Sequence, residues 1–329
     1  MPDVTPEPIM RTAMGFMAAK HLFVASEIGL FEALAQGPAS LETLTQRTKV
    51  PQRTLRIAAD AMVALGFVER DGEHYRNGPV AAAFLGGAAG APDFRPMLRF
   101  FNRISYPAWL RLGDAVRTGE GQSHFERFTP EEQRIFSEGV ESFSAPMAAA
   151  LAGAYDFGRH RRLLDVGGGT GSFLLPVLRQ HPGLKGTLFE LPGAAAVARQ
   201  RVAREPEGER IEVVAGDMFK DALPAGHDAV LVANTVHVLS VAHNLELLRH
   251  IRRHAASGTR LLLVDMWTDP THTQPPAAPL MAGEFLVIAG EGQAYSEAEA
   301  DAWFTETGWR KLERKPLAGP GSLIVVEAA

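Results

Sequence analysis

Residues 163–171 read Leu163-Leu164-Asp165-Val166-Gly167-Gly168-Gly169-Thr170-Gly171, an apolar run that ends in an aspartate and a glycine-rich turn. The apolar run predicts a buried strand, and the Ser172-Phe173-Leu174-Leu175 stretch that follows predicts a helix. Glycines at such a junction allow a tight turn and let a ligand approach the backbone closely. The segment therefore predicts a strand–turn–helix unit that binds a ligand.

Further strands alternate with helical segments from this point to the end of the chain. One of these helices covers residues 243–254, where Leu245, Leu248 and Ile251 share a face and Gly258 follows the end. Alternating strands and helices predict an α/β fold, a mostly parallel sheet with helices on both faces. The predicted strands are 162–166, 186–190, 211–214, 229–232, 259–264 and 322–326.

A carboxylate ends the next predicted strand at the expected distance from the glycine turn. Glu190 lies 19 residues beyond Gly171, where an acidic side chain can accept hydrogen bonds from both hydroxyls of a ribose. A nicotinamide dinucleotide is one candidate ligand. The pattern here is DxGGGxG, however, and the carboxylate of Asp165 suits a cation better than a pyrophosphate. No Lys-Ser/Thr pair follows the glycines, which disfavours nucleoside triphosphates.

The third predicted strand is followed by Gly216-Asp217-Met218-Phe219. Asp217 can accept a hydrogen bond from the amino group of an adenine, and Met218 and Phe219 can lie against the base. Each residue alone is also compatible with a helix cap or simple core packing. Together with the glycine turn and Glu190, they predict a site for an adenosine-containing cofactor.

The N-terminal part predicts two helices and a hairpin, which is a winged-helix pattern. Ser40 can cap a helix, Pro51 can begin the next one, and Asp71-Gly72 is a hairpin turn. Residues 1–85 contain eight Lys/Arg and nine Asp/Glu, a net charge of −1. Binding of a nucleic acid requires several cations on one face, so we expect an interface domain that does not bind DNA.

A methionine-rich stripe marks the first predicted helix. Ile9, Met10, Met14 and Met17 share one face at helical spacing, which is typical of core or of a subunit interface.

The region 94–157 reads as helices and is rich in aromatic residues, among them Trp109. Aromatic side chains there are candidates for the lining of a substrate pocket.

Composition narrows the class of protein further. The 329 residues have a net charge of −5 and contain no cysteine, which excludes disulfides, cysteine-ligated metal and thiol nucleophiles. No apolar run of about 20 residues is present, so no membrane association is expected. We see no targeting segment at the N-terminus, and the absence of cysteine fits a cytoplasmic protein.

The motifs DVGGGTG, FELP and GDMF, followed by a histidine after the fourth strand, resemble the S-adenosylmethionine-dependent O-methyltransferases of the caffeic acid and acetylserotonin type. The resemblance extends over nearly the whole chain. It implies a class I methyltransferase, Rossmann-like sheet of order 3-2-1-4-5-7-6, with the last strand antiparallel, and an N-terminal dimerisation domain. It implies domains at 1–93, 94–157 and 158–329 and a homodimer.

The resemblance also assigns roles to residues of this chain. Gly167 and Gly169, near Asp165, would contact the amino-acid part of S-adenosylmethionine. Glu190 would hold the ribose, and Asp217 and Met218 the adenine. His237 matches the general base of the family, and Asp265, 28 residues later, matches the acidic residue that orients it. A carboxylate partner fixes the tautomer of such a histidine and stabilises its protonated form.

Several positions depart from the family pattern. Ala233 replaces a frequent lysine, and Val238 and Leu239 follow His237 in place of Asp-Trp. The second catalytic glutamate of plant members is absent: Ala294 lies at or near its place, and Glu291 could replace it only if the loop shifts. These departures bear on base catalysis and leave the cofactor motifs intact.

Glu284 lies where the family often places an asparagine that contacts substrate, so Glu284 and Trp109 are the predicted substrate-binding residues. A metal held by His237 and Glu284 is an alternative, but we expect no metal. The predicted function is O-methylation of a small aromatic or polyketide-like molecule. The alternatives are methylation of carbon, sulfur or nitrogen, a non-methylating use of the cofactor, and a DNA-binding regulator.

Overall fold

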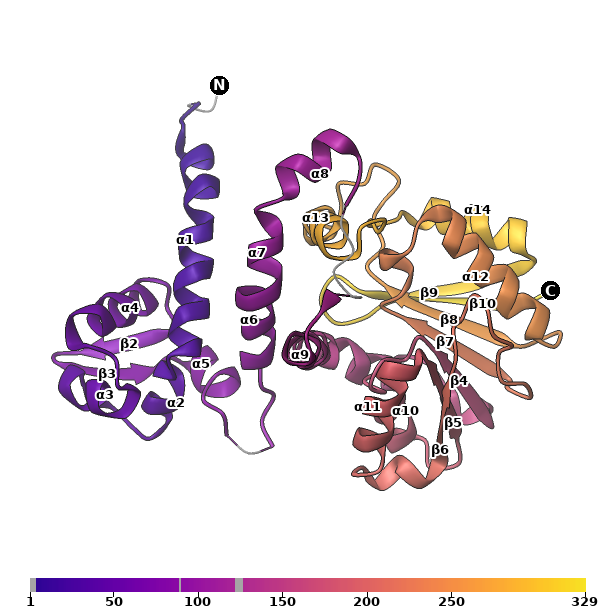
Figure 1. Ribbon diagram of the computed structural model, residues 1–329, viewed down its shortest axis with the longest axis horizontal. Helices are drawn as coiled ribbons and strands as arrows, with labels where there is room; N and C mark the ends of the chain where they lie inside the picture. The colour runs from indigo at the N-terminus through magenta and orange to yellow at the C-terminus, as the bar shows by residue number, and fades with distance from the viewer. Residues whose placement is uncertain (1–3, 89, 122–126) are drawn as a thin grey trace. The chain divides into compact units, whose positions relative to one another are not determined.

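The computed structural model describes residues 4–88, 90–121 and 127–329, which fall into two compact units. The first unit comprises Met1–Pro107 and Thr129–Phe143, and the second comprises Ala108–Phe128 and Ser144–Ala329. Figure 1 labels most of the helices and strands of both units. The division of the chain at 1–93, 94–157 and 158–329 stays a prediction.

The first unit contains the predicted pair of helices and hairpin. Ser40 caps α3 by accepting a hydrogen bond from the backbone N–H of Thr43 (3.3 Å), and Pro51 precedes α4. Gly72 has a φ of 57°, the left-handed conformation that the turn of the hairpin requires. The elements are α1 (Glu7–Glu27), α2 (Leu30–Ala35), β1 (Ala39–Ser40), α3 (Leu41–Thr48), α4 (Gln52–Ala64), β2 (Val68–Asp71), β3 (His74–Asn77), α5 (Pro79–Phe84), α6 (Arg95–Phe100) and the π-helical turn η1 (Phe101–Ser105).

The methionine-rich stripe of α1 is exposed in the single chain. The exposed fractions run from 47% for Met17 to 71% for Ile9, with Met10 and Met14 between them. The stripe therefore does not belong to the core of this unit, which lies at the other end of α1, around Ala25, and under α2 to α4. Of the two interpretations that the sequence allowed, the structure excludes intramolecular core.

Helices dominate the region between residues 95 and 154, as the sequence predicts. The π-helical turn η1 continues directly into α7 (Tyr106–Trp109), and α8 (Leu112–Thr118) follows. The long helix α9 (Pro130–Ala154) leads to the sheet. Among the described residues, no helix has both the length and the apolar character needed to cross a membrane.

The second unit is built on a seven-stranded sheet of order β6-β5-β4-β7-β8-β10-β9. Numbered along the sheet-forming part of the chain, this is the predicted order 3-2-1-4-5-7-6. β10 is antiparallel to both of its neighbours, β8 and β9. The other four pairs of the sheet, all among β4 to β8, are parallel. The strands are β4 (Arg162–Val166), β5 (Lys185–Glu190), β6 (Ile211–Ala215), β7 (Ala229–Ala233), β8 (Arg260–Asp265), β9 (Trp309–Pro316) and β10 (Ser322–Ala328).

The edge strand β9 was not predicted. Its sequence, WRKLERKP, is strongly charged, and its residues alternate between more and less exposed positions. A charged edge strand resists pairing with other chains, but it lacks the continuous apolar run by which the buried strands were recognised. The six strands predicted from apolar runs therefore do not include β9, although the strand order implied by the family resemblance contains seven strands.

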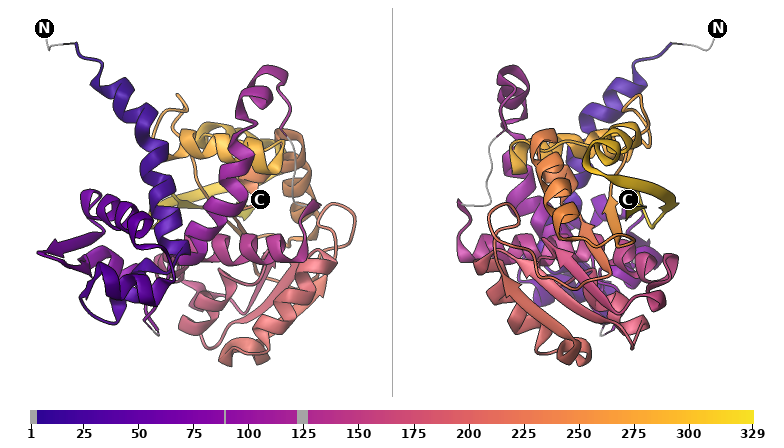
Figure 2. Two further views of the ribbon diagram at one scale, coloured as in Figure 1. Left: turned by 60° about the vertical axis from the view of Figure 1, so that its left-hand side comes forward. Right: turned by 90° about the vertical axis from the view of Figure 1, so that its right-hand side faces the viewer.

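Alternate residues of the central strands supply two apolar layers, one on each face of the sheet. On one face, Leu164 and Val230 pack against α12 (Val241–His254) and α14 (Glu297–Thr307). On the other face, Leu163 packs with residues of α9, with α10 (Leu174–Gln180) and with α11 (Pro192–Val202). Both views in Figure 2 show the sheet as a twisted layer with helices beside it.

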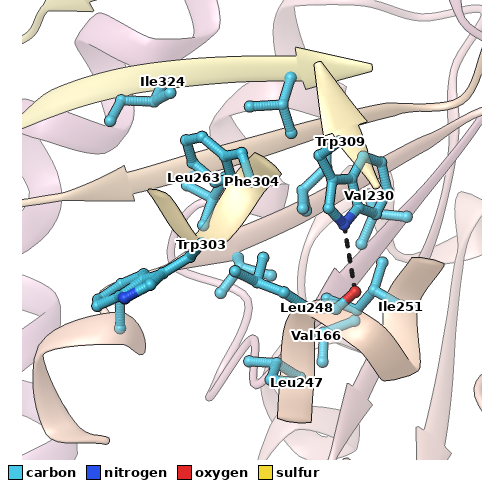
Figure 3. Close-up of a cluster of buried hydrophobic side chains, with 14 of the residues drawn as sticks. Val166, Val230, Leu247, Leu248, Ile251, Leu263, Trp303, Phe304, Trp309 and Ile324 are labelled. Atoms are coloured by element: carbon cyan, nitrogen blue, oxygen red, sulfur yellow. Dashed lines mark hydrogen bonds between the residues drawn. The ribbon is translucent and has the colours of Figure 1, made fainter. Parts of the chain in front are cut away.

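Figure 3 shows the first of these layers. Trp309 is buried there, and its indole N–H donates a hydrogen bond to the backbone carbonyl of Leu248 at 3.2 Å. The bond connects the edge strand to α12 and satisfies the polar atom of a large buried side chain. These two apolar layers hold the carboxyl ends of the parallel strands in place. The predicted cofactor-binding residues, with His237 and Asp265, lie at or just after those ends.

Candidate active site

The glycine-rich turn lies where the order of the parallel strands reverses. β4 pairs with β5 on one side and with β7 on the other, and successive connections leave in opposite directions from this point. Ligands of open α/β sheets bind beyond the carboxyl ends of the strands at such a switch point. Gly167 and Gly169 have φ angles of 68° and 56°, so their conformation favours glycine.

Glu190 ends β5, as the sequence predicts, and its side chain reaches the glycine turn. Its Oε2 accepts a hydrogen bond from the backbone N–H of Gly169 (2.9 Å), and its Oε1 accepts one from Leu191 (2.7 Å). Burial raises the pKa of this carboxyl, and the two backbone hydrogen bonds oppose the rise. The side chain therefore connects β5 to the turn.

Asp165 is a buried carboxyl that has no hydrogen-bond partner within the described part of the chain. The residue is 1% exposed, and neither of its side-chain oxygens is paired. Burial, with a smaller contribution from the nearby Glu190, raises the pKa of Asp165 to about 8. A Cβ on Gly168 would lie 2.6 Å from Oδ2 of Asp165, so the turn passes directly over the carboxyl. Such a group requires a donor or a positive charge from a ligand, which S-adenosylmethionine can supply.

Asp217 follows β6 and is held by local interactions. Its carboxylate accepts a hydrogen bond from the backbone N–H of Phe219 (2.9 Å) and pairs with Lys220 (2.9 Å), and both lower its pKa. The sulfur of Met218 lies 4.0 Å from the position that a Cβ on Gly167 would occupy. Asp217 and Met218 therefore lie at the same edge of the sheet as the glycine turn.

The structure brings His237 and Asp265 together. His237 lies in the short 3₁₀ turn η5 (Val236–Val238) after β7, and Asp265 ends β8. Nδ1 of His237 is 2.6 Å from Oδ1 of Asp265, and both residues are buried. The backbone N–H groups of His237 (3.3 Å) and Met266 (2.8 Å) also donate to this carboxylate. The carboxylate thus fixes the orientation of the imidazole.

Two contacts to His237 could not be predicted from the sequence. The ring of Phe285 stacks on the imidazole, with a centroid distance of 3.9 Å and an interplanar angle of 22°. Gly292 lies against the backbone, and a Cβ there would be 2.2 Å from the carbonyl oxygen of His237. No sequence pattern distinguishes Phe285 from its apolar neighbours in α13 (Ala277–Ala289), so only the packing identifies it.

Glu291 is turned toward the start of α12. Its Oε1 is 2.6 Å from Nδ1 of His243 and accepts a hydrogen bond from the backbone N–H of Ser240 (3.1 Å). Ala294, at or near the place of the missing glutamate, is buried. In this arrangement the described residues place no second carboxylate beside His237 from the loop that follows α13.

Trp109 and Glu284 also meet, although 175 residues separate them. The indole N–H donates to Oε2 of Glu284, which is 5% exposed, and the ring lies over Gly283 at 2.9 Å from a Cβ placed there. Both residues belong to the second unit. The described residues contain no group of three potential His, Cys, Asp or Glu metal ligands.

Known proteins resemble this chain over both units. Residues 109–310 match the model of the O-methyltransferase domain, and residues 10–87 match that of the O-methyltransferase dimerisation domain. The 3-hydroxy-5-methyl-1-naphthoate 3-O-methyltransferase of Streptomyces sahachiroi is 36% identical over 98% of this chain and 94% of its own length. The acetylserotonin O-methyltransferase of Mus musculus is 30% identical over 95% of this chain and 86% of its own. The solved structure of PigF with SAH superposes with a TM-score of 0.86 at 28% identity, covering 98% of this chain and 100% of that one.

The sheet order, the glycine turn at the switch point and the match to the O-methyltransferase domain define an S-adenosylmethionine-dependent class I methyltransferase. Within that class, the chain belongs to the O-methyltransferase family. The resemblance, the fold and the cofactor that the sequence predicted are confirmed. The roles of individual residues stay predictions.

Proposed function

We propose that the protein transfers a methyl group from S-adenosylmethionine to a hydroxyl of a small aromatic or polyketide-like molecule, with His237 as general base. The observation that carries this proposal is the 2.6 Å contact between Nδ1 of His237 and Oδ1 of Asp265. The relative from Streptomyces sahachiroi is named for methylation of a hydroxyl on a naphthoate, which supports an aromatic acceptor.

The proposed role of the histidine follows from its surroundings. A carboxylate at Nδ1 keeps the proton on that nitrogen, so Nε2 carries the lone pair that can accept a proton. A phenol has an ordinary pKa of about 10, so removal of its proton as the bond forms makes the oxygen a better nucleophile. Asp265 then stabilises the positive charge on the imidazole, and Phe285 restricts the ring to one plane.

The cofactor would be held by residues at the carboxyl ends of β4, β5 and β6. The proposed contacts are Asp165, Gly167 and Gly169 for the amino-acid part, Glu190 for the ribose, and Asp217 with Met218 for the adenine. When bound, S-adenosylmethionine supplies a methyl group on a positively charged sulfur. Orientation of the acceptor and exclusion of water contribute most of the remaining catalysis in such displacements.

Trp109 and Glu284 are the proposed acceptor contacts. The indole offers a flat apolar surface, and the adjacent carboxylate can accept a hydrogen bond from a hydroxyl or an amine of the acceptor. Methylation of nitrogen is the second candidate, because the buried carboxylate of Glu284 could accept the proton that a neutral amine loses after its nitrogen attacks the methyl group. Formation of an N-methyl product by the purified enzyme would select it.

Binding of S-adenosylmethionine, measured by calorimetry, tests the cofactor site. We expect micromolar affinity for the intact protein and a loss of at least tenfold for Glu190→Ala, because the ribose hydroxyls lose their acceptor. A matched control is Glu205→Ala, which removes a carboxylate paired with Arg179 away from the glycine turn. Equal affinity in all three proteins would contradict the assignment of Glu190. A screen of phenols, amines, thiols and keto acids for S-adenosylhomocysteine release then identifies the acceptor.

We further propose that the protein is a homodimer formed through the first unit. The dimerisation domain match and the exposed apolar stripe on α1 support this state. Replacing both Met10 and Met14 by glutamate is expected to produce monomers, because the stripe would place four like charges in one interface. Light scattering after size-exclusion chromatography measures the mass. The control is Val197→Glu on α11, and a stripe variant that stays dimeric would refute the interface.

A further inference from the structure

The turn between β7 and His237 contains a residue in an uncommon conformation. Asn234 has a φ of 53°, in the left-handed region that asparagine tolerates better than other residues with a side chain. Its backbone N–H donates to the carbonyl of Val264 (2.9 Å), which holds it beside β8. Conformations of this kind persist where the surroundings determine them, and they are enriched at functional sites.

The amide of Asn234 has a defined orientation. Its Nδ2 donates a hydrogen bond to Oγ of Ser144 on α9 at 2.8 Å, and Ser144 is 1% exposed. With the NH₂ group directed at the serine, Oδ1 remains as an acceptor. That oxygen is inaccessible to solvent and has no hydrogen-bond partner among the residues that the structure describes.

Asn234 and Asp165 lie at the carboxyl ends of adjacent strands. Asp165 of β4 is in register with Leu231 of β7, and Asn234 directly follows the end of β7. Thr235, the next residue, has its Oγ1 3.2 Å from the position that a Cβ on Gly167 would occupy, so this turn lies against the glycine turn. The switch point is therefore flanked by three buried side-chain oxygens that lack donors, two from Asp165 and one from Asn234.

We propose that Oδ1 of Asn234 is a cofactor-binding group that accepts a hydrogen bond from the ammonium of the amino-acid part of S-adenosylmethionine, together with the carboxylate of Asp165. The chemistry of the site selects this part of the ligand. Oδ1 of Asn234 can only accept hydrogen bonds, and Asp165 presents two more acceptor oxygens once a neighbouring positive charge ionises it. The three oxygens therefore favour a cationic N–H donor over a carboxylate or a phosphate. An ammonium carries three N–H donors and a positive charge, and buried acceptors without partners are costly until such a donor arrives.

This inference rests on the cofactor site proposed above and adds one residue to it. It is distinct from the roles of Gly167 and Gly169, which present backbone groups, and of Glu190, which faces the ribose. It also explains why the strained conformation is retained: a left-handed Asn234 directs its amide to Ser144 and away from the path of a regular strand.

The test compares two ligands that differ only in the amino-acid part. S-adenosylhomocysteine contains the ammonium, whereas 5′-methylthioadenosine contains the same adenosine and lacks it. Calorimetry is done with the full chain and with Asn234→Gly, which tolerates the left-handed backbone and removes only the amide. We expect Asn234→Gly to weaken S-adenosylhomocysteine about tenfold and to leave the affinity for 5′-methylthioadenosine unchanged.

Two further variants make the result specific. Glu190→Ala is expected to weaken both ligands, because both carry the ribose, and Asn234→Asp is expected to retain S-adenosylhomocysteine, because an acceptor remains. Unchanged S-adenosylhomocysteine affinity in Asn234→Gly, or an equal loss for both ligands, would overturn the role of Asn234 and leave the cofactor site standing. Failure of the wild-type protein to bind either ligand would overturn the cofactor site and this inference with it.

Discussion

Replacing His237 by alanine is expected to lower kcat by about 10²–10⁴-fold, the contribution that a positioned general base makes. The affinity for S-adenosylmethionine should stay within about twofold of wild type, because none of the proposed cofactor contacts comes from the imidazole. The measurement is the initial rate of S-adenosylhomocysteine formation with an identified acceptor, paired with calorimetry of the cofactor.

Asp265→Asn is the companion variant. It keeps the volume of the carboxylate but removes the charge that supports the imidazole, so we expect a loss smaller than that of His237→Ala. His254→Ala is the matched control, because this histidine lies at the end of α12 and its ring contacts only His250 of the same helix among the interactions of its side chain given by the structure. A kcat of His237→Ala close to wild type would reject base catalysis and favour the alternatives that need no base, methylation of a stronger nucleophile or a non-methylating reaction.

Asp165→Asn is expected to raise the stability of the folded protein and to weaken the binding of the cofactor. The folded-state pKa of about 8 lies above the ordinary value of 3.8, because burial, with Glu190, disfavours the charged form. Folding thus loses stability as pH rises through the interval between these two values, where the unfolded chain ionises and the folded protein does not. Asparagine does not ionise, so the variant escapes this loss.

The pH dependence checks this argument. Without cofactor, the Tm of Asp165→Asn should exceed that of wild type by an amount that grows from pH 5 to pH 8 and is constant above pH 8, reaching about 5–10 °C. With saturating S-adenosylmethionine the difference should shrink, since the variant binds the cofactor about 10–100-fold more weakly. Gly193→Ala, at an open position of α11, serves as a control. A Tm difference that does not change with pH would contradict the conclusion that Asp165 is a buried carboxyl without a partner.

Part of the site could be predicted from the sequence because its components are local. The glycine turn, Asp165 and the strand before it occupy nine consecutive residues, and their φ angles and burial agree with that prediction. Glu190 and Asp217 each follow an apolar strand, and carboxyl ends of parallel strands meet at one edge. The strand order itself came from the resemblance to a family, since spacing alone does not order the strands of a sheet.

The pairing of His237 with Asp265 could be predicted only in part from the sequence. Each residue ends a predicted strand or follows one, and adjacent strands β7 and β8 bring the two ends together. The strand positions therefore favour proximity. The 2.6 Å contact and the extra backbone donors to Asp265 depend on the 3₁₀ turn η5, whose geometry no periodic pattern encodes.

By itself, the sequence determined the α/β class, the glycine turn that a ligand approaches, and the capped helices and hairpin of the first unit. Each of these features depends on residues that are close to one another in the sequence. Only the tertiary structure decided that Glu291 binds His243 and Ser240, that Phe285 covers the imidazole, and that Trp109 reaches Glu284. The physical reason is that these contacts join segments that lie 48 to 175 residues apart in the sequence, so their geometry follows from how helices and strands pack. The three donor-free oxygens of Asp165 and Asn234 belong to the same category: a sequence names polar residues, but only the packing shows which of them is left without a partner.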